Sequence, residues 1–323
     1  MRIQTWRFSV GRLKADHAAR PGLAEVLAVW ALFGLVAVAV LVAAARVPTA
    51  DLYNVSETGI VGGAGRALVF VGYPTALVAI AILALLVERL RRRWALVVAA
   101  VAAVLCATVA WPGVVEQSDL DAKPANGLAG IGVLVAVVLT AVALARGGIG
   151  VRRPFGGRWD IARLVLAVVL LLASIPWILA DVGIEAEDVP GLGALFMSGE
   201  VLPEPGHPDL IAVHLGHHHG MDGTLLALAA LALSRAFPGV TGRLMRPVLG
   251  FYLSLMLVYG LANALQDFWL EQLVKRGTTS HRIPTLTEPE ASPAWAAMVA
   301  AALLIHFVAR RVGTVKSRPE GVA

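Results

Sequence analysis

Long apolar runs separated by short polar segments make up most of this chain. Eight of these runs reach or approach the ~20 residues that an α-helix needs to cross a hydrocarbon core. They extend from Leu23 to Ala45, Ala67 to Val87, Trp94 to Trp111, Leu128 to Ala145, Ile161 to Ala180, Thr224 to Phe237, Val248 to Leu270 and Ala294 to Val308. Helices satisfy their own backbone hydrogen bonds, as the bilayer interior requires. The pattern predicts an all-α integral membrane protein, a polytopic bundle of about eight transmembrane helices.

The composition agrees with a membrane protein. Of the 323 residues, 58% are hydrophobic and 15% are charged, and the mean hydropathy is +0.76. Soluble domains of this length are less apolar. The abundance of Ala, Val and Arg is typical of a high-GC bacterium, so we expect a bacterial plasma-membrane location. The net charge of +5 implies no nucleic-acid partner, because we expect these cations to face membrane lipids with anionic headgroups.

Arginine and lysine are concentrated in alternate connections between the apolar runs. The N-terminus, the second-to-third, fourth-to-fifth and sixth-to-seventh connections and the tail hold most of them, whereas most carboxylates lie in the other connections. Because Lys and Arg gather in cytoplasmic loops, both termini are predicted to be cytoplasmic. The expected organisation is a cytoplasmic segment over 1-22, a helix bundle over 23-310 with a long extracytoplasmic loop at 181-222, and a cytoplasmic tail over 311-323.

The first apolar run has two interpretations. The basic residues before it and the small residues Ala43, Ala44 and Ala45 at its end also fit a cleavable signal peptide. The run is longer than the roughly 7 to 15 residues of a signal-peptide core, which favours a retained first helix. Cleavage would leave the remaining helices unchanged.

The segment from His214 to Asp222 concentrates potential metal ligands where the long polar loop meets the sixth apolar run. On a helix, His214, His218 and Asp222 follow one another at four-residue spacing, and His217 shares their face. Imidazoles one turn apart are how helices chelate zinc and related ions. We therefore expect His214, His217, His218 and Asp222 to bind a divalent metal, with Zn²⁺ as the leading candidate. Gly220 lies on the opposite face, where a neighbour can pack closely.

A polar stripe lies near the end of the seventh run, on the same side of the membrane. Asn263, Gln266, Asp267 and Glu271 occupy one helix face by their spacing. Ionisable groups in a span usually face an interior or a water-filled cavity. Asp267 and Glu271 are predicted to be catalytic, as a general base or as the carboxylate that orients a metal-bound imidazole. The same stripe also fits hydrogen bonding between helices.

Several isolated residues complete the set of candidates. His306 lies near the inner end of the last run and is interpreted as an interfacial polar residue. Cys106 is the only cysteine, which excludes an intramolecular disulfide. Further polar residues on the side of the histidine cluster are Asp51, Tyr53, Asn54, Glu57, Asp181, His207, Asp209 and His281.

The leading functional hypothesis is a metal-dependent membrane hydrolase that activates water on an envelope or lipid substrate. The main alternative is non-catalytic handling, transport or sensing of a metal or haem, and a third is a structural or assembly partner of an envelope complex. Four clustered histidines also fit a solvated, pH-responsive loop. Charges are scarce in the middle of the spans, which argues against ion-coupled transport. Few Met or Cys residues lie near the cluster, which disfavours copper.

Overall fold

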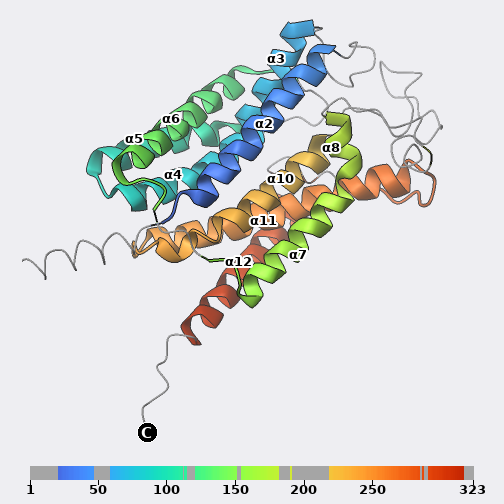
Figure 1. The fold of residues 1–323 in the computed structure, drawn as a ribbon. Coiled ribbons are helices and arrows are strands. Elements are labelled where there is room, and N and C mark those ends of the chain that lie inside the picture. The colour runs from blue at the N-terminus through green and yellow to red at the C-terminus, as the bar shows by residue number, and fades with distance from the viewer. Residues whose placement is uncertain are drawn as a thin grey trace, which may run out of the picture.

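The computed structural model of this chain describes residues 21–46, 59–111, 113–114, 121–150, 154–181, 190, 218–283, 286 and 290–315. Every regular element in this part of the chain is helical, and the helices run alternately up and down one bundle (Figure 1). The predicted all-α fold is confirmed. Most of the predicted segments over 1-22, 181-222 and 311-323 lies outside the described residues, although the last helix continues to Val315.

The helices account for nearly all of the predicted apolar runs. In chain order they are α2 (Ala24–Arg46), α3 (Gly59–Phe70), η2 (Val71–Thr75), α4 (Ala76–Leu90), α5 (Arg93–Ala107), η3 (Thr108–Ala110), α6 (Pro124–Gly147), α7 (Arg158–Ala173), α8 (Ile175–Asp181), α10 (His218–Leu233), η4 (Phe237–Gly239), α11 (Met245–Trp269), η5 (Leu270–Val274) and α12 (Pro293–Val315).

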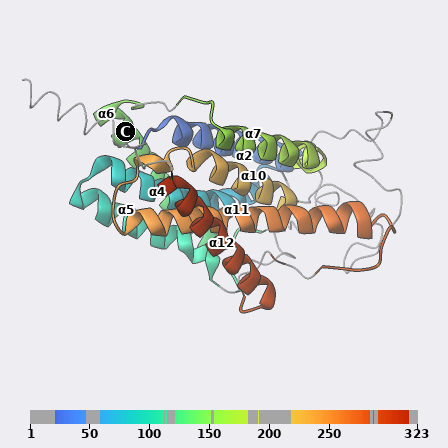
Figure 2. The same ribbon diagram turned by 90° about the horizontal axis from the view of Figure 1, so that it is seen from below.

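Among the described residues, six helical segments are long and apolar enough to cross a membrane. They are Ala24–Arg46, Gly59–Leu90, Arg93–Ala110, Pro124–Gly147, Met245–Val274 and Pro293–Arg311. This composition identifies a multi-pass membrane protein. Figure 2 shows α12 lying across α11. In Figure 1, α2 and α4 lie between the α5–α6 pair and the α10–α11 pair.

The fifth and sixth predicted runs differ from single long spans. The run from Ile161 to Ala180 is divided at Ser174 into α7 and α8, because Pro176 has no N–H to continue the hydrogen-bond ladder and is tolerated only in the first turn of a new helix. The sixth run begins earlier than expected, at His218, and its helix ends at Leu233 rather than Phe237.

A π-helical turn interrupts the second span where Pro74 removes a backbone donor. The carbonyl of Phe70 would ordinarily accept from residue 74, and the hydroxyl of Thr75 donates to it instead at 3.1 Å. A second hydroxyl, from Tyr252 of α11, donates to the carbonyl of Leu77 at 2.7 Å. These bonds keep backbone acceptors satisfied inside an apolar bundle, where no water replaces them.

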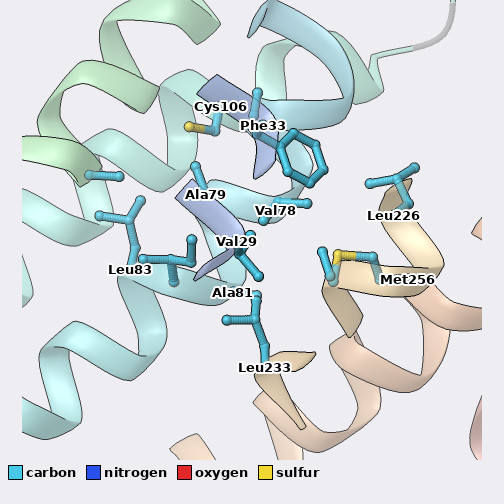
Figure 3. Packing of buried hydrophobic residues seen from close by; sticks show 14 of the residues in the cluster. Val29, Phe33, Val78, Ala79, Ala81, Leu83, Cys106, Leu226, Leu233 and Met256 are labelled. Carbon is cyan, nitrogen blue, oxygen red and sulfur yellow. The ribbon is translucent and has the colours of Figure 1, made fainter. Parts of the chain in front are cut away.

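Small and branched side chains fill the centre of the bundle. Val29 and Phe33 of α2 meet Val78 and Ala79 of α4, and α10 and α11 close the other side of this core (Figure 3). Outward-facing positions on α5, α6, α7 and α12 are apolar and exposed, as expected for lipid-facing helices. The described core between the two ends is mainly apolar, with a few buried hydroxyls such as those of Thr75 and Ser254.

One end of the bundle, called the arginine end, contains the starts of α2, α5, α7 and α11. Arg89 is buried there and donates to three carbonyls, those of Pro21 at 2.7 Å, Gly147 at 2.9 Å and Gly148 at 2.6 Å. The neighbouring Glu88 accepts from the backbone N–H groups of residues 241 and 242, both at 3.0 Å. These two adjacent side chains link the end of α4 by hydrogen bonds to three other parts of the chain.

A charged cluster joins α7, α10 and α2 at the same end. Arg235 lies 2.7 Å from a carboxylate oxygen of Asp160 and 3.4 Å from one of Glu25, and Arg163 lies 3.0 Å from Asp160. Asp160 precedes the apolar part of α7. Burial alone would raise the pKa of Asp160, but the Gly156 N–H and the Arg235 guanidinium outweigh this and hold it below its usual value.

Candidate functional site

The opposite end, called the carboxylate end, contains the start of α10 and the end of α11. These two helices form the most closely packed pair in the described structure. At their crossing, a Cβ on Gly260 would lie 2.5 Å from the carbonyl oxygen of Gly223 and 2.8 Å from the nitrogen of Ala227. Such contact between backbones is typical of small residues at four-residue spacing in membrane helices. It brings the polar residues next to the crossing close together.

The described part of α10 is short for a membrane-spanning helix. Its apolar part is Gly220–Leu233, which spans about 21 Å at ~1.5 Å per residue, less than a ~30 Å hydrocarbon core. The first N–H groups of a helix have no acceptor in their own helix. Asp267 of α11 supplies one, because its Oδ2 accepts from the Gly220 N–H at 3.1 Å. The carboxylate therefore caps α10 from the neighbouring helix.

Gly220 is enclosed on both sides. A Cβ at this position would lie 2.5 Å from Oδ2 of Asp267 and 2.6 Å from the ring carbons Cδ2 and Cε2 of Trp177 on α8. Close by, the hydroxyls of Ser174 and Thr224 share a hydrogen bond of 2.5 Å. The absence of a side chain at Gly220 is what lets α8, α10 and α11 meet at this point.

The predicted polar face of α11 is buried. Asn263, Gln266, Asp267 and Glu271 are all less than one-tenth exposed, as is Asp222 of α10. Two of these side chains form hydrogen bonds with backbone groups. Asn263 donates to the Tyr259 carbonyl at 2.8 Å, and Gln266 accepts from the N–H of residue 286 at 3.1 Å. The prediction that these side chains face the interior is confirmed, whereas their catalytic roles stay a prediction.

Glu271 forms an ion pair that was not predicted from the sequence. It lies in the π-helical turn η5, and its Oε1 is 3.0 Å from Nζ of Lys275. Both side chains are more than nine-tenths buried. Glutamate four residues before lysine is the favourable order for such a pair.

The predicted metal ligands divide between described and undescribed parts of the chain. Asp222 is buried one turn after His218, which is the first residue of α10. His214 and His217 lie outside the described residues, and so does the side chain of His218. Among the residues that the structure describes, no three His, Cys, Asp or Glu side chains are arranged to hold a metal ion. The four-ligand set therefore stays a prediction.

Other histidines are placed clearly. His281 is exposed, and its carbonyl accepts from the Trp269 indole at 2.8 Å. His306 is buried between α11 and α12, and a Cβ on Gly250 would lie 2.9 Å from its ring. A glycine on the neighbouring helix makes room for the ring, and the interfacial role of His306 stays a prediction.

Three residues of this region were not singled out as functional by their sequence pattern. The sequence predicts that Gly220 permits close packing, but it does not predict the contact of Gly220 with Asp267. It also does not indicate that Trp177 and Lys275 belong to the site. The sequence pattern that does indicate the ion pair is a glutamate, Glu271, four residues before a lysine, Lys275.

Comparison with protein-family models, curated proteins and solved structures found no match for this chain.

Proposed function

We propose that this multi-pass protein of the bacterial plasma membrane binds a divalent metal, with Zn²⁺ as the leading candidate, at its carboxylate end. The ligands are His214, His217, His218 and Asp222, and this end faces away from the cytoplasm. In this orientation the arginine end and both termini are cytoplasmic, in accord with the distribution of lysine and arginine.

One observation carries the proposal. The Asp267 carboxylate binds the Gly220 N–H at 3.1 Å, so a fixed acidic group stands beside the helix start from which Asp222 and His218 extend. Asp222 is itself buried. A buried carboxylate is costly unless hydrogen bonds, an opposite charge or a metal ion offset its charge. A divalent ion would do this and match the oxygen and nitrogen ligands.

The chemistry proposed for the site is hydrolysis of an envelope or lipid substrate. A bound Zn²⁺ supplies a Lewis acid and lowers the pKa of coordinated water toward neutrality. Asp267 is oriented by its hydrogen bond to Gly220, which suits a carboxylate that positions a ligand or accepts a proton. Glu271 is less suited to accept a proton because it is paired with Lys275 at 3.0 Å.

Non-catalytic metal handling is the second candidate function. It is favoured by the engagement of both predicted bases, Asp267 with the α10 backbone and Glu271 with Lys275. A site of this kind would bind and release its ion without turnover. Haem in place of a single ion would give strong visible absorption, which separates the two kinds of ligand.

The test is elemental analysis by mass spectrometry of detergent-purified protein, together with a visible absorption spectrum. Wild type is compared with the His214→Ala/His218→Ala variant, and His281→Ala serves as control because it removes an exposed histidine outside the cluster. We expect near-stoichiometric metal in wild type and control and its loss in the double variant. Absence of metal in all three, after incubation with Zn²⁺ and Ni²⁺, would overturn the proposal.

Activity then separates the two functions. Labelled phospholipids and envelope precursors are incubated with metal-loaded wild type and with the Asp267→Asn variant. Hydrolysis by wild type that falls at least tenfold in the variant, with metal retained, supports the hydrolase. Metal exchange without any hydrolysis supports non-catalytic handling.

A further inference from the structure

A cluster of arginines lies at the opposite end of the molecule from the proposed metal site. Arg92 and Arg93 stand at the start of α5, directly before Trp94, and Arg146 lies in the last turn of α6. The Arg146 guanidinium lies over the Trp94 ring, 5.3 Å from its centroid. All four side chains are exposed. This set is called the α5–α6 arginine cluster.

The positive charge of the cluster is not balanced by the protein in its described part. Glu25, Glu88 and Asp160 are the carboxylates described at this end, and each is engaged elsewhere, with Arg235 or with the backbone of residues 241 and 242. No ion pair joins Arg92, Arg93 or Arg146 to a described carboxylate, and α5 has no acidic residue in its first turn. Arg92, Arg93 and Arg146 are therefore three exposed cations with no described acidic partner at this end.

The cluster stands where the lipid-facing surface begins. Just beyond Trp94, α5 exposes Leu96, Val97 and Val101 by 50%, 62% and 57%. Tryptophan is enriched at the level of lipid headgroups, where its ring is half apolar and half polar. We expect the Arg146 guanidinium, which lies over the Trp94 ring, to be at the depth of lipid phosphates.

The support behind the cluster is rigid. Arg89 donates to the carbonyls of Gly147 and Gly148, which directly follow Arg146, and the Leu23 N–H donates to the Ile149 carbonyl at 2.9 Å. The end of α6 is thereby fixed against α2 and α4. A binding site on fixed helix ends loses little conformational freedom when a ligand is bound.

We propose that the α5–α6 arginine cluster binds the phosphate of an anionic phospholipid. The planar guanidinium group forms paired hydrogen bonds with phosphate oxygens, which lysine does not reproduce. Basic pockets between membrane helices select anionic headgroups in this way. The lipid's acyl chains would lie along the exposed apolar face of α5. This binding is independent of the proposed metal site.

A second tryptophan–arginine pair provides a matched control. Arg158 lies over Trp159 at the start of α7, with 5.5 Å between the guanidinium carbon and the ring centroid. Here Asp160 is two residues away, and Arg163 and Arg235 are paired with its carboxylate. The Arg158→Gln variant thus removes an exposed arginine from the same end without touching the cluster.

The test is native mass spectrometry of detergent-purified protein with added phosphatidylglycerol or phosphatidylcholine of equal chain length. Wild type and Arg158→Gln are expected to retain phosphatidylglycerol in preference to phosphatidylcholine. The Arg92→Gln/Arg93→Gln/Arg146→Gln variant is expected to lose this preference, by roughly fivefold in affinity for each arginine removed. Retention equal to wild type in the triple variant, or equal loss in Arg158→Gln, would overturn the proposal.

Two further measurements keep the result interpretable. The Arg146→Lys variant retains the charge and the fold but not the guanidinium fork, and its affinity is expected to lie between those of wild type and the triple variant. Soluble glycerol phosphate at the same concentration is expected to leave the bound lipid in place. Displacement by glycerol phosphate would show a site for free phosphate and contradict a lipid site. Metal content is expected to be unchanged in all these variants.

Discussion

The two ends of this bundle differ in which charged side chains are exposed and which are buried. At the arginine end, the described carboxylates are few and satisfied, buried Arg89 binds three carbonyls, and further arginines are exposed. At the carboxylate end, Asp222, Asp267 and Glu271 are buried, and Asp267 accepts a hydrogen bond from the Gly220 N–H in the first turn of α10. Exposed cations suit a headgroup region, whereas buried anions suit a site that holds a cation.

The contrast has a simple energetic basis. An exposed arginine beside anionic lipid is favourable and needs no partner within the protein. A carboxylate taken out of water costs several kcal/mol unless hydrogen bonds, an opposite charge or a metal compensate it. Two of the buried carboxylates have such compensation in the described structure, Asp267 from the Gly220 N–H and Glu271 from Lys275.

The largest expected effect comes from Arg89→Ala at the arginine end. The carbonyls of Pro21, Gly147 and Gly148 would each lose a charge-assisted hydrogen bond, so we expect a loss of about 4 kcal/mol in the free energy of unfolding. Thermal unfolding in detergent measures this. Arg92→Ala is the control, with an expected change within about 0.5 kcal/mol because the side chain is exposed. Equal effects of the two substitutions would contradict the role given to Arg89.

Gly260→Ala tests the crossing that assembles the carboxylate end. The added Cβ would meet the Gly223 carbonyl at 2.5 Å, and since backbone atoms of α10 line the contact, we expect a loss of about 2 kcal/mol. Gly34→Ala is the matched control, because no atom lies within 4 Å of a Cβ at that position. If both variants unfold at the same temperature, the close contact of α10 and α11 is not required.

Asp267→Asn tests whether the charge at the start of α10 matters. The amide oxygen can still accept from Gly220, so only the charge-assisted part of the bond is lost, about 1 kcal/mol. If Asp267 orients a metal ligand, metal affinity falls at least about tenfold. Titration with Zn²⁺ and thermal unfolding measure both. Unchanged metal affinity would leave Asp267 a structural cap alone.

The smallest expected effect is the acid response of Asp160. Its pKa is lowered in the folded protein, since the Gly156 N–H and Arg235 outweigh the effect of burial. The stabilisation is therefore complete above the unfolded value of about 4 and is lost as the pH falls through the lower folded value. The difference in melting temperature between wild type and Asp160→Asn should narrow below about pH 4. A constant difference would contradict the assignment.

Helix positions were the most predictable feature of this chain. Runs of apolar residues long enough for a bilayer predicted six long spans correctly, because hydropathy is a property of the segment itself. The division at Ser174 was not predicted, because the run from Ile161 to Ala180 was taken as one helix, although a proline such as Pro176 is tolerated in the first turn of a new helix. Burial of the α11 stripe also followed from spacing alone.

The candidate site was predictable only in part. Residue spacing placed Asp222 and Asp267 on suitable faces, but not the bond from Gly220 to Asp267, which depends on how closely two helices approach. That approach is set by Gly223 and Gly260, whose meeting is a tertiary contact. The same limit applied to His306, whose burial depends on Gly250 of another helix.

X-ray absorption at the zinc edge, on detergent-purified protein loaded with one equivalent of Zn²⁺, tests the proposed metal site most directly. The spectrum reports the atoms around the ion. We expect scattering from imidazole rings together with oxygen at the distances of a four-coordinate site, ~2.0 to 2.2 Å. The imidazole signal should weaken in His214→Ala/His218→Ala and remain in His281→Ala. Zinc surrounded by water oxygens alone, or no retained zinc, would contradict the proposal.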